Sequence, residues 1–382
     1  MSVTAPHGFR AAGVAAGLKP AGALDVALVV NDGPSDAAAG VFTTNRVKAA
    51  PVLWSQQVLT TGRLRAVVLN SGGANACTGP DGFTDTHHTA EKAAAALNLG
   101  AAEVAVCSTG LIGERLPMPQ LLAGVDAAAE NLGPNGDAAA QAIMTTDTVA
   151  KTSVHTGDGW SIGGMAKGAG MLAPALATML CVITTDADLD SSTVDKALRA
   201  VTARTFDRID SDGCMSTNDT VILMASGASG ITPDYEEFRA GLENVCHDLA
   251  LQLIADAEGA TKRIAVAVRT AASEADALEV ARSISRSALL KCALYGNDPN
   301  WGRVLAAVGT TRAAFEPDAL DVAINGVTIC KNGAAAADRS TVDLTGREVS
   351  IVVDLNAGPD EATVWTTDLT PGYVHENSAY SS

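Results

Sequence analysis

The sequence is poor in aromatic residues and in positive charge. Only 4% of its 382 residues are Phe, Trp or Tyr, and 26 Lys and Arg residues stand against 43 Asp and Glu residues, which gives a formal net charge of −17. Few rings are available to stack on bases, and an acidic chain repels phosphate backbones and anionic lipid headgroups. The basic residues form no local cluster that could offset this repulsion. We therefore expect neither nucleic acid nor a membrane as a partner.

Cysteine patterns typical of disulfide frameworks and zinc sites are also missing. The seven cysteines are odd in number and widely spaced, and no two of them form a C-x-x-C pair. The chain shows neither a secretory signal at its start nor an apolar run long enough to span a membrane. We expect a cytoplasmic protein without a metal ion or a cofactor.

What the sequence does contain is enough apolar material for a large core. Hydrophobic residues make up 47% of the chain, and its length favours two lobes. Helical patterns at Thr84–Leu99 and Tyr235–Ala257 alternate with strand-like runs, which predicts layers of the α/β class. These runs are Asp25–Val30, Gly40–Thr44, Arg65–Asn70, Glu103–Ser108, Thr178–Thr185, Thr220–Ala225 and Arg263–Val268, with several more after Asp318.

The stretch from Trp160 to Pro174 is rich in glycine and nearly uncharged, and we expect one long irregular segment there. Its cluster Gly163–Gly170 fits neither the Walker pattern nor the dinucleotide-binding pattern. Long loops inside compact domains are often functional, so the residues around this segment are candidates for a site.

Thr178 follows this segment as the first residue of an apolar run, and two interpretations are open. It can be a β-branched residue that starts a buried strand. Alternatively, the bond between Ala177 and Thr178 breaks, so that the Thr178 hydroxyl becomes a nucleophile. The freed α-amine, with an ordinary pKa of about 7.7 to 8, would then serve as the general base.

Several longer motifs occur along the whole chain. They are Asn70-Ser-Gly-Gly-Ala-Asn-Ala-Cys77, Ser108-Thr-Gly-Leu-Ile-Gly113, Met144-Thr-Thr-Asp-Thr148, Lys167-Gly-Ala-Gly-Met171, Ala177-Thr-Met-Leu180, Ser216-Thr-Asn-Asp-Thr220, Asp298-Pro-Asn-Trp-Gly-Arg303 and Gly372-Tyr-Val-His-Glu-Asn-Ser-Ala-Tyr380. In kind and order, these motifs resemble those of the ornithine acetyltransferase (glutamate N-acetyltransferase) family.

The resemblance implies a layered α/β sandwich of the self-cleaving, N-terminal-nucleophile-like type. It implies cleavage into chains 1–177 and 178–382, which assemble as a heterotetramer with two copies of each chain. It also implies transfer of an acetyl group from N2-acetylornithine to glutamate through an acetyl-threonine, in arginine biosynthesis. Use of acetyl-CoA as a donor stays open. Three alternatives remain: a self-cleaving aminopeptidase or amidase, a paralogue with another acceptor in secondary metabolism, and a silent amino-acid-binding protein.

The site residues follow from the turn chemistry and from the resemblance. Thr109 and Gly110 come directly after a strand, where a tight turn can aim backbone N–H groups and a hydroxyl at an oxyanion; an ordinary turn is the alternative. Lys167 lies among residues too small to cover it, which suits an ammonium that meets a substrate carboxylate. The resemblance assigns substrate contacts to Thr145, Lys167, Thr178, Glu258, Asn377 and Ser382.

The C-terminal part carries two further expectations. Glu258 should close the long helix just before Gly259, where a carboxylate opposes the helix dipole and would suit pairing with a substrate cation. Tyr373 and Tyr380 lie within the last ten residues. Such large side chains predict a tail that docks on the protein instead of fraying.

Overall fold

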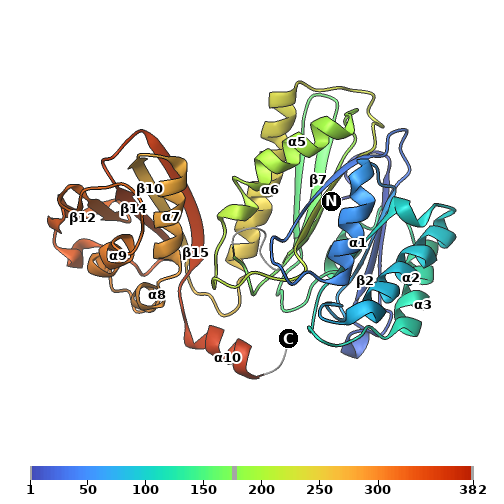
Figure 1. Cartoon of the computed structure of the whole chain (residues 1–382), viewed down its shortest axis with the longest axis horizontal. Coiled ribbons are helices and arrows are strands. Elements are labelled where there is room, and N and C mark those ends of the chain that lie inside the picture. The colour runs from blue at the N-terminus through green and yellow to red at the C-terminus, as the bar shows by residue number, and fades with distance from the viewer. Residues whose placement is uncertain (1, 174–178, 380–382) are drawn as a thin grey trace. The chain divides into compact units, whose positions relative to one another are not determined.

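The computed structural model describes residues 2–173 and 179–379 (Figure 1). They divide into two compact units, which confirms the two lobes expected from the length. Unit 1 contains the residues up to Asp207 together with Cys214–Leu253, and unit 2 contains Arg208–Gly213 together with the residues from Ile254 onward. Among the described residues, no helix has both the length and the apolar character needed to cross a bilayer.

The described part of unit 1 contains two β-sheets. The first has the order β1-β2-β4-β5 and is antiparallel except between β4 and β5. The second has the order β3-β9-β8-β7-β6 and is antiparallel except between β8 and β9. The strands are β1 (Phe9–Val14), β2 (Val26–Asn31), β3 (Ala37–Phe42), β4 (Ala66–Asn70), β5 (Val104–Ser108), β6 (Lys151–Thr156), β7 (Ser161–Lys167), β8 (Leu180–Thr185) and β9 (Thr220–Ala225).

The two sheets of unit 1 face each other across a shared core. Val67 and Leu69 of the first sheet belong to the same buried cluster as Val182 and Ile222 of the second. Helices α2 and α3 cover the other face of the first sheet, and α5 and α6 lie on the outer side of the second (Figure 1). The helices are α1 (Ala50–Val58), α2 (Gly79–Leu97), α3 (Met118–Glu130), α4 (Gly136–Ala142), α5 (Ser191–Thr202) and α6 (Tyr235–Ala255). This layering confirms the predicted α/β sandwich.

The glycine-rich stretch is not irregular throughout, so that prediction was wrong. Its first half is β7, which pairs along its length with β6 and β8. A Cβ on Gly163 would lie 2.1 Å from the carbonyl oxygen of Ser2, and a Cβ on Gly164 would lie 2.9 Å from Leu249 of α6. The glycines therefore permit close packing on both faces of a buried strand instead of marking a loop.

The predicted cleavage point does not coincide with a boundary between units. Residues 177 and 178 separate β7 from β8, which are neighbours in one sheet. The sheet would thus take β3, β6 and β7 from the chain before the cut and β8 and β9 from the chain after it. Because strands of the two chains pair with each other, we expect the chains to stay associated after cleavage.

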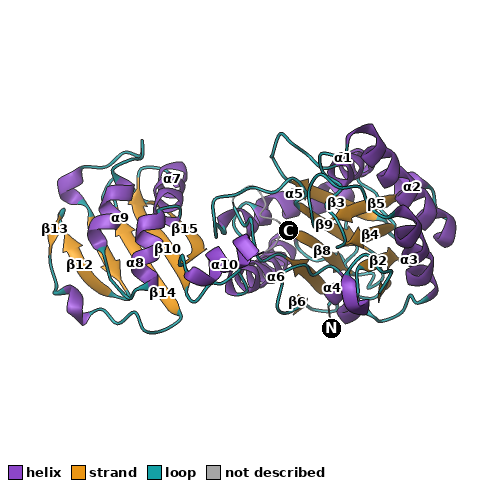
Figure 2. Ribbon diagram, turned by 90° about the horizontal axis from the view of Figure 1, so that it is seen from below, coloured by secondary structure: helices purple, strands orange, loops and turns teal. Residues whose placement is uncertain are grey.

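Unit 2 is built on one six-stranded sheet with the order β13-β12-β11-β14-β10-β15. Helices α7, α8 and α9 pack on one face of the sheet, and α10 follows β15 (Figure 2). The strands are β10 (Arg263–Ala271), β11 (Asp321–Ile324), β12 (Val327–Lys331), β13 (Ala334–Ala335), β14 (Glu348–Asp354) and β15 (Asp360–Thr367). The helices are α7 (Glu274–Ser285), α8 (Ala288–Tyr295), α9 (Trp301–Val308) and α10 (Pro371–Ala379).

Candidate active site

The described site residues of unit 1 gather where strands of its two sheets end. Lys167, the last residue of β7, stands opposite Leu180, the first residue of β8. In the first sheet, the parallel strands β4 and β5 end side by side, and Thr109 follows β5. The two sheets meet at this point, because the Lys167 Nζ donates a hydrogen bond of 3.3 Å to the Thr109 Oγ1.

The turn formed by Thr109 and Gly110 offers two hydrogen-bond donors. The Thr109 N–H is already used, since it donates to the Asn70 carbonyl oxygen at 3.0 Å. The Gly110 N–H makes no hydrogen bond to a described residue. Glycine is needed at this position because the backbone φ is +131° and because a Cβ there would lie only 2.8 Å from the Gly73 N. Because Lys167 donates to the Thr109 Oγ1, the hydroxyl proton of Thr109 can point elsewhere. That hydroxyl and the Gly110 N–H are suited to bind an oxyanion.

Lys167 is held inside the unit by a buried ionic cluster. Lys167 is only 1% exposed, so the expectation that its neighbours are too small to cover it was wrong. The small neighbours lie along the chain, whereas the cover comes from residues distant in sequence. Asp147 accepts from the Lys151 Nζ at 2.6 Å, and both of these side chains are fully buried.

Asp147 ties this cluster to Thr145, a predicted substrate residue, and to the backbone just after Lys167. Its carboxylate accepts from the Gly168 N–H at 2.7 Å and from the Thr145 N–H at 2.9 Å. Burial alone would raise the pKa of Asp147, but the charges of Lys167 and Lys151 and the Gly168 N–H outweigh it and hold the pKa at about 2. Within this cluster one carboxylate stands against two lysines, and Lys167 also lies close enough to Asp219 to lower the pKa of that buried carboxyl.

Asp147 and Lys151 are site residues that the sequence analysis did not assign. The Met144–Thr148 motif contained Asp147, but nothing in its spacing showed that the carboxylate is buried. The partner Lys151 lies four residues later, at the start of β6, and not on a helix where such spacing would predict a pair. Only the fold shows that the two side chains meet.

In unit 2, the structure brings Glu258 and Asn377 together. The Asn377 Nδ2 donates to the Glu258 Oε2 at 2.9 Å. Glu258 does not close the helix as expected, because α6 ends at Ala255 and Glu258 lies in the following turn. This turn is packed against the start of α10: a Cβ on Gly259 would lie 2.2 Å from the Tyr373 N, and the φ of Gly259 is +62°.

The expected docking of the C-terminal tail is found at the base of α10. The Thr370 Oγ1 donates to the Gly259 carbonyl oxygen at 2.6 Å, and Tyr373 is partly buried. The rest of α10 has no buried residue among those described. The described part of the tail is thus attached at the base of α10 through Thr370 and again, further along the helix, through the Asn377 side chain.

Four of the predicted cleavage, site and tail residues are not among those that the structure describes. Ala177, Thr178, Tyr380 and Ser382 lie outside the described residues. Met179 is the first described residue after Thr178, and its N–H donates to the Asp219 Oδ1 at 3.1 Å.

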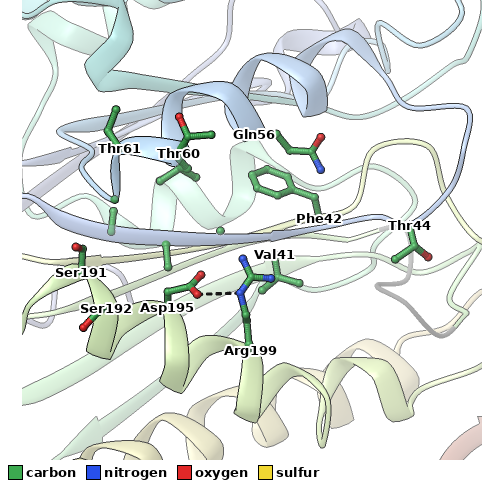
Figure 3. Close-up of a pocket in the computed structure, with 15 residues that line it drawn as sticks. Val41, Phe42, Thr44, Gln56, Thr60, Thr61, Ser191, Ser192, Asp195 and Arg199 are labelled. Atoms are coloured by element: carbon green, nitrogen blue, oxygen red, sulfur yellow. Dashed lines mark hydrogen bonds and ion pairs between the residues drawn. The ribbon is translucent and has the colours of Figure 1, made fainter.

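A pocket of about 680 Å³ elsewhere in unit 1 contains none of the predicted site residues (Figure 3). It lies between β3, the end of α1 and the first turns of α5. The Arg199 Nε donates to the Asp195 Oδ2 at 2.9 Å within its wall. Among the described residues, no group of three or more His, Cys, Asp or Glu side chains is placed to hold a metal ion. The geometry therefore favours the turn after β5 as the candidate site.

Fold and site together define an α/β-sandwich protein with donors suited to an acyl-transfer oxyanion. Comparisons with known proteins identify the family. The ArgJ family model matches residues 10–382. The arginine biosynthesis bifunctional protein ArgJ of Streptomyces coelicolor is 67% identical over 383 residues, and the protein of the same name from Thermobifida fusca is 66% identical over 383 residues; both matches cover 100% of each chain.

A solved structure, the ornithine acetyltransferase from Mycobacterium tuberculosis complexed with ornithine, is 66% identical and covers 47% of this chain and 96% of its own, with a TM-score of 0.45. On the family model and the full-length relatives, this chain belongs to the ArgJ family. The resemblance seen in the motifs is confirmed.

Proposed function

We propose that this chain transfers an acetyl group from N2-acetylornithine to glutamate after cutting itself between Ala177 and Thr178. The observation that carries the proposal is the pair of donors after β5, the Thr109 hydroxyl and the Gly110 N–H, beside a buried lysine. The names of the full-length relatives support a place in arginine biosynthesis. The word "bifunctional" in those names supports a second activity, for which we propose acetylation of glutamate from acetyl-CoA.

Self-cleavage prepares the nucleophile. The Thr178 Oγ attacks the Ala177 carbonyl carbon, the peptide nitrogen leaves as the amine of Thr178, and an ester joins the two segments. Water then hydrolyses this ester and frees the hydroxyl. The new α-amine has an ordinary pKa near neutrality, so it can accept the hydroxyl proton without a histidine.

Acetyl transfer follows in two half-reactions. The Thr178 Oγ attacks the acetyl carbonyl of acetylornithine and its proton passes to the α-amine, while Thr109 and Gly110 stabilise the oxyanion. Collapse expels ornithine, whose amine takes that proton, and leaves an acetyl ester on Thr178. The amine of glutamate attacks the ester, and acetylglutamate leaves as the Thr178 hydroxyl is restored.

Both substrates share an α-carboxylate, which needs a common cationic anchor. The cluster of Lys167, Lys151 and Asp147 has the required positive excess, and Thr145 is joined to it through its N–H. We assign Lys167 and Thr145 to the shared carboxylate. Glu258, with Asn377 and Ser382, is assigned to the side-chain end that differs between ornithine and glutamate.

The assembly and location remain parts of the proposal. We expect two copies of each cleaved chain in a heterotetramer, and a location in the cytoplasm. The alternation of strands from both chains in the second sheet supports the association of the chains with each other.

The test combines donor specificity with trapping of the intermediate. Purified protein should yield chains 1–177 and 178–382, and acetylornithine alone should add one acetyl mass to the second chain. Glutamate should be acetylated by acetylornithine in parallel-line, ping-pong kinetics. Thr178→Ala should abolish cleavage and turnover. Active protein that stays uncut would contradict the proposal, and release of free acetate without acceptor acetylation would favour an amidase.

A further inference from the structure

Two adjacent residues before β9, Asn218 and Asp219, make hydrogen bonds to the backbone next to the proposed oxyanion turn and next to Thr178 in the chain. Asp219 is fully buried, and its Oδ1 accepts the Met179 N–H at 3.1 Å. The carbonyl oxygen of Met179 accepts the Thr220 N–H, also at 3.1 Å. The residue that follows Thr178 in the chain is therefore fixed on both sides of its backbone.

The second carboxyl oxygen of Asp219 indicates that stability alone does not explain this residue. The Asp219 Oδ2 is buried and has no hydrogen-bond partner among the described residues. The hydroxyl of the nearby Thr43 donates instead to the Ser216 carbonyl oxygen. Burial raises the pKa of Asp219 well above its usual value, against the opposing effects of the Met179 N–H, the nearby Thr43 and Ser216 hydroxyls and the Lys167 charge. An unsatisfied buried oxygen is destabilising, so its retention needs another reason.

Asn218 makes hydrogen bonds to the backbone next to the proposed oxyanion turn. Its Nδ2 donates to the Ser108 carbonyl oxygen at 2.8 Å and to the Ala74 carbonyl oxygen at 2.6 Å, and its side chain is 5% exposed. The Ser108 carbonyl belongs to the peptide unit whose N–H is that of Thr109, and that N–H donates to Asn70. The peptide that precedes the oxyanion turn is thus fixed at both ends.

We propose that Asn218 and Asp219 are positioning residues that set the oxyanion turn against the nucleophile, with Asn218 fixing the Ser108–Thr109 peptide and Asp219 fixing Met179. Since the two residues are consecutive, one short stretch of rigid backbone defines the spacing between the two parts. A small misplacement of either part lowers the rate of the chemical step, because preorganised donors act only over a narrow range of positions. This inference rests on the proposed function.

Asn218→Asp tests the first contact, because it keeps the shape and replaces the donor by an oxygen facing two carbonyls. We expect kcat to fall about 100-fold with KM within about threefold, as for the loss of an oxyanion donor. Asn31→Asp is the matched control. Asn31 is 2% exposed, and its Nδ2 also donates to two carbonyl oxygens, those of Ser35 and Ala225, the latter at the far end of β9. An equal fall in kcat for both variants at equal folded fraction would overturn the proposal.

Asp219 is tested with two variants, because the effect of losing its acceptor oxygen must be distinguished from the effect of losing its carboxyl group. Asp219→Asn keeps an oxygen that can accept the Met179 N–H, whereas Asp219→Leu removes it at similar volume. We expect Asp219→Asn to retain kcat within about fivefold and Asp219→Leu to lose about 100-fold, with slower self-cleavage. A loss in Asp219→Asn as large as that in Asp219→Leu would overturn the positioning role, because the carboxyl group itself would then be needed.

Failure of the inference can be told apart from failure of the proposed function. Mass spectrometry of the wild-type protein with acetylornithine shows whether chain 178–382 is acetylated at all; its absence refutes the proposed function. If the wild type is acetylated and the Asn218 and Asp219 variants are acetylated at the same rate, only the inference is refuted. If Asn218→Asp or Asp219→Leu does not fold, Asn218→Ser and Asp219→Asn provide the test instead. The kcat of Asn218→Ser should fall about 10-fold, and that of Asp219→Asn should fall less. A larger fall for Asp219→Asn than for Asn218→Ser would refute the proposal.

Discussion

The predicted site residues form two groups that differ in how the protein holds them. In unit 1, Thr109 and Lys167 are 3% and 1% exposed and are fixed by contacts between residues far apart in sequence. In unit 2, Glu258 is partly exposed and Asn377 is exposed, and one hydrogen bond joins their side chains. Donors that act on a transition state need a rigid, buried setting, whereas residues that read two different side chains tolerate a looser one.

The difference also appears in the electrostatics. The unit 1 group depends on a fully buried ion pair, and such pairs are costly to break because one charge is left without a partner. The unit 2 group contains a carboxylate that water still reaches. Substitutions in the two groups should therefore differ in kind: those in unit 1 should affect stability and the chemical step, and those in unit 2 should affect substrate preference.

The largest effect is expected when the buried pair is broken. Lys151→Met leaves Asp147 ionised without its nearest partner, and should lower the free energy of unfolding by about 3–5 kcal/mol. The matched control is Arg199→Met, which removes an ion pair with the same i, i+4 spacing but with side chains 61% and 44% exposed. Urea titrations should show a loss of less than about 0.5 kcal/mol for the control. Equal losses would show that burial does not distinguish the two pairs.

The second effect concerns the oxyanion turn. Thr109→Val removes the hydroxyl at nearly constant volume, and should lower kcat about 100- to 1,000-fold with little change in KM. Steady-state kinetics of both half-reactions provide the measurement. Thr109→Ser restores the hydroxyl and should recover most of the rate. If Thr109→Val were as active as Thr109→Ser, the hydroxyl would not be an oxyanion donor.

The third effect is a dependence of stability on pH. The folded pKa of Asp147, about 2, lies below the value of about 3.9 typical of an unfolded chain. A lowered pKa means that the ionised form favours folding, so this contribution is complete above about pH 5 and is lost progressively as the pH falls toward 2. Asp147 should thus account for roughly 2–3 kcal/mol of the acid-induced loss of stability. Unfolding curves of Asp147→Asn between pH 2 and pH 5 should be flatter by that amount, and an unchanged slope would contradict the buried cluster.

How much the sequence could predict depends on whether a feature is local. The boundaries of β9 were predicted correctly because an apolar run between polar residues defines them. β7 was missed because Gly163 and Gly164 were interpreted as loop residues, and only the N-terminal segment and α6 explain why glycine is needed in that strand. Thr109 and Gly110, for which an oxyanion site and an ordinary turn were both open, do follow a strand directly, as the sequence predicted.

The remaining errors share this cause. The end of α6 was placed too late because the buried Ala257 continues the apolar pattern, whereas the turn is fixed by Gly259 against Tyr373, more than a hundred residues away. The burial of Lys167 and its link to Asp147 likewise come from contacts that no spacing along the chain encodes. The sequence thus supplied the candidate site residues, and the fold was needed to show which contacts hold the described ones in place.

The smallest effect is expected in unit 2, and it tests the comparison most directly. Glu258→Gln keeps an oxygen that can accept from Asn377, so the free energy of unfolding should change by less than about 0.5 kcal/mol. If Glu258 pairs with the side-chain ammonium of ornithine, KM for acetylornithine should rise about 10-fold, as expected for loss of a charge-assisted hydrogen bond, while KM for glutamate stays within about twofold. Asn377→Ala, which leaves the carboxylate in place and removes only the hydrogen bond from Asn377, should produce a smaller rise of the same sign. An equal rise in both KM values would place Glu258 with the shared carboxylate anchor instead. A fall in kcat without any change in KM would show that the unit 2 group takes part in the chemical step, and the contrast between the two groups would no longer hold.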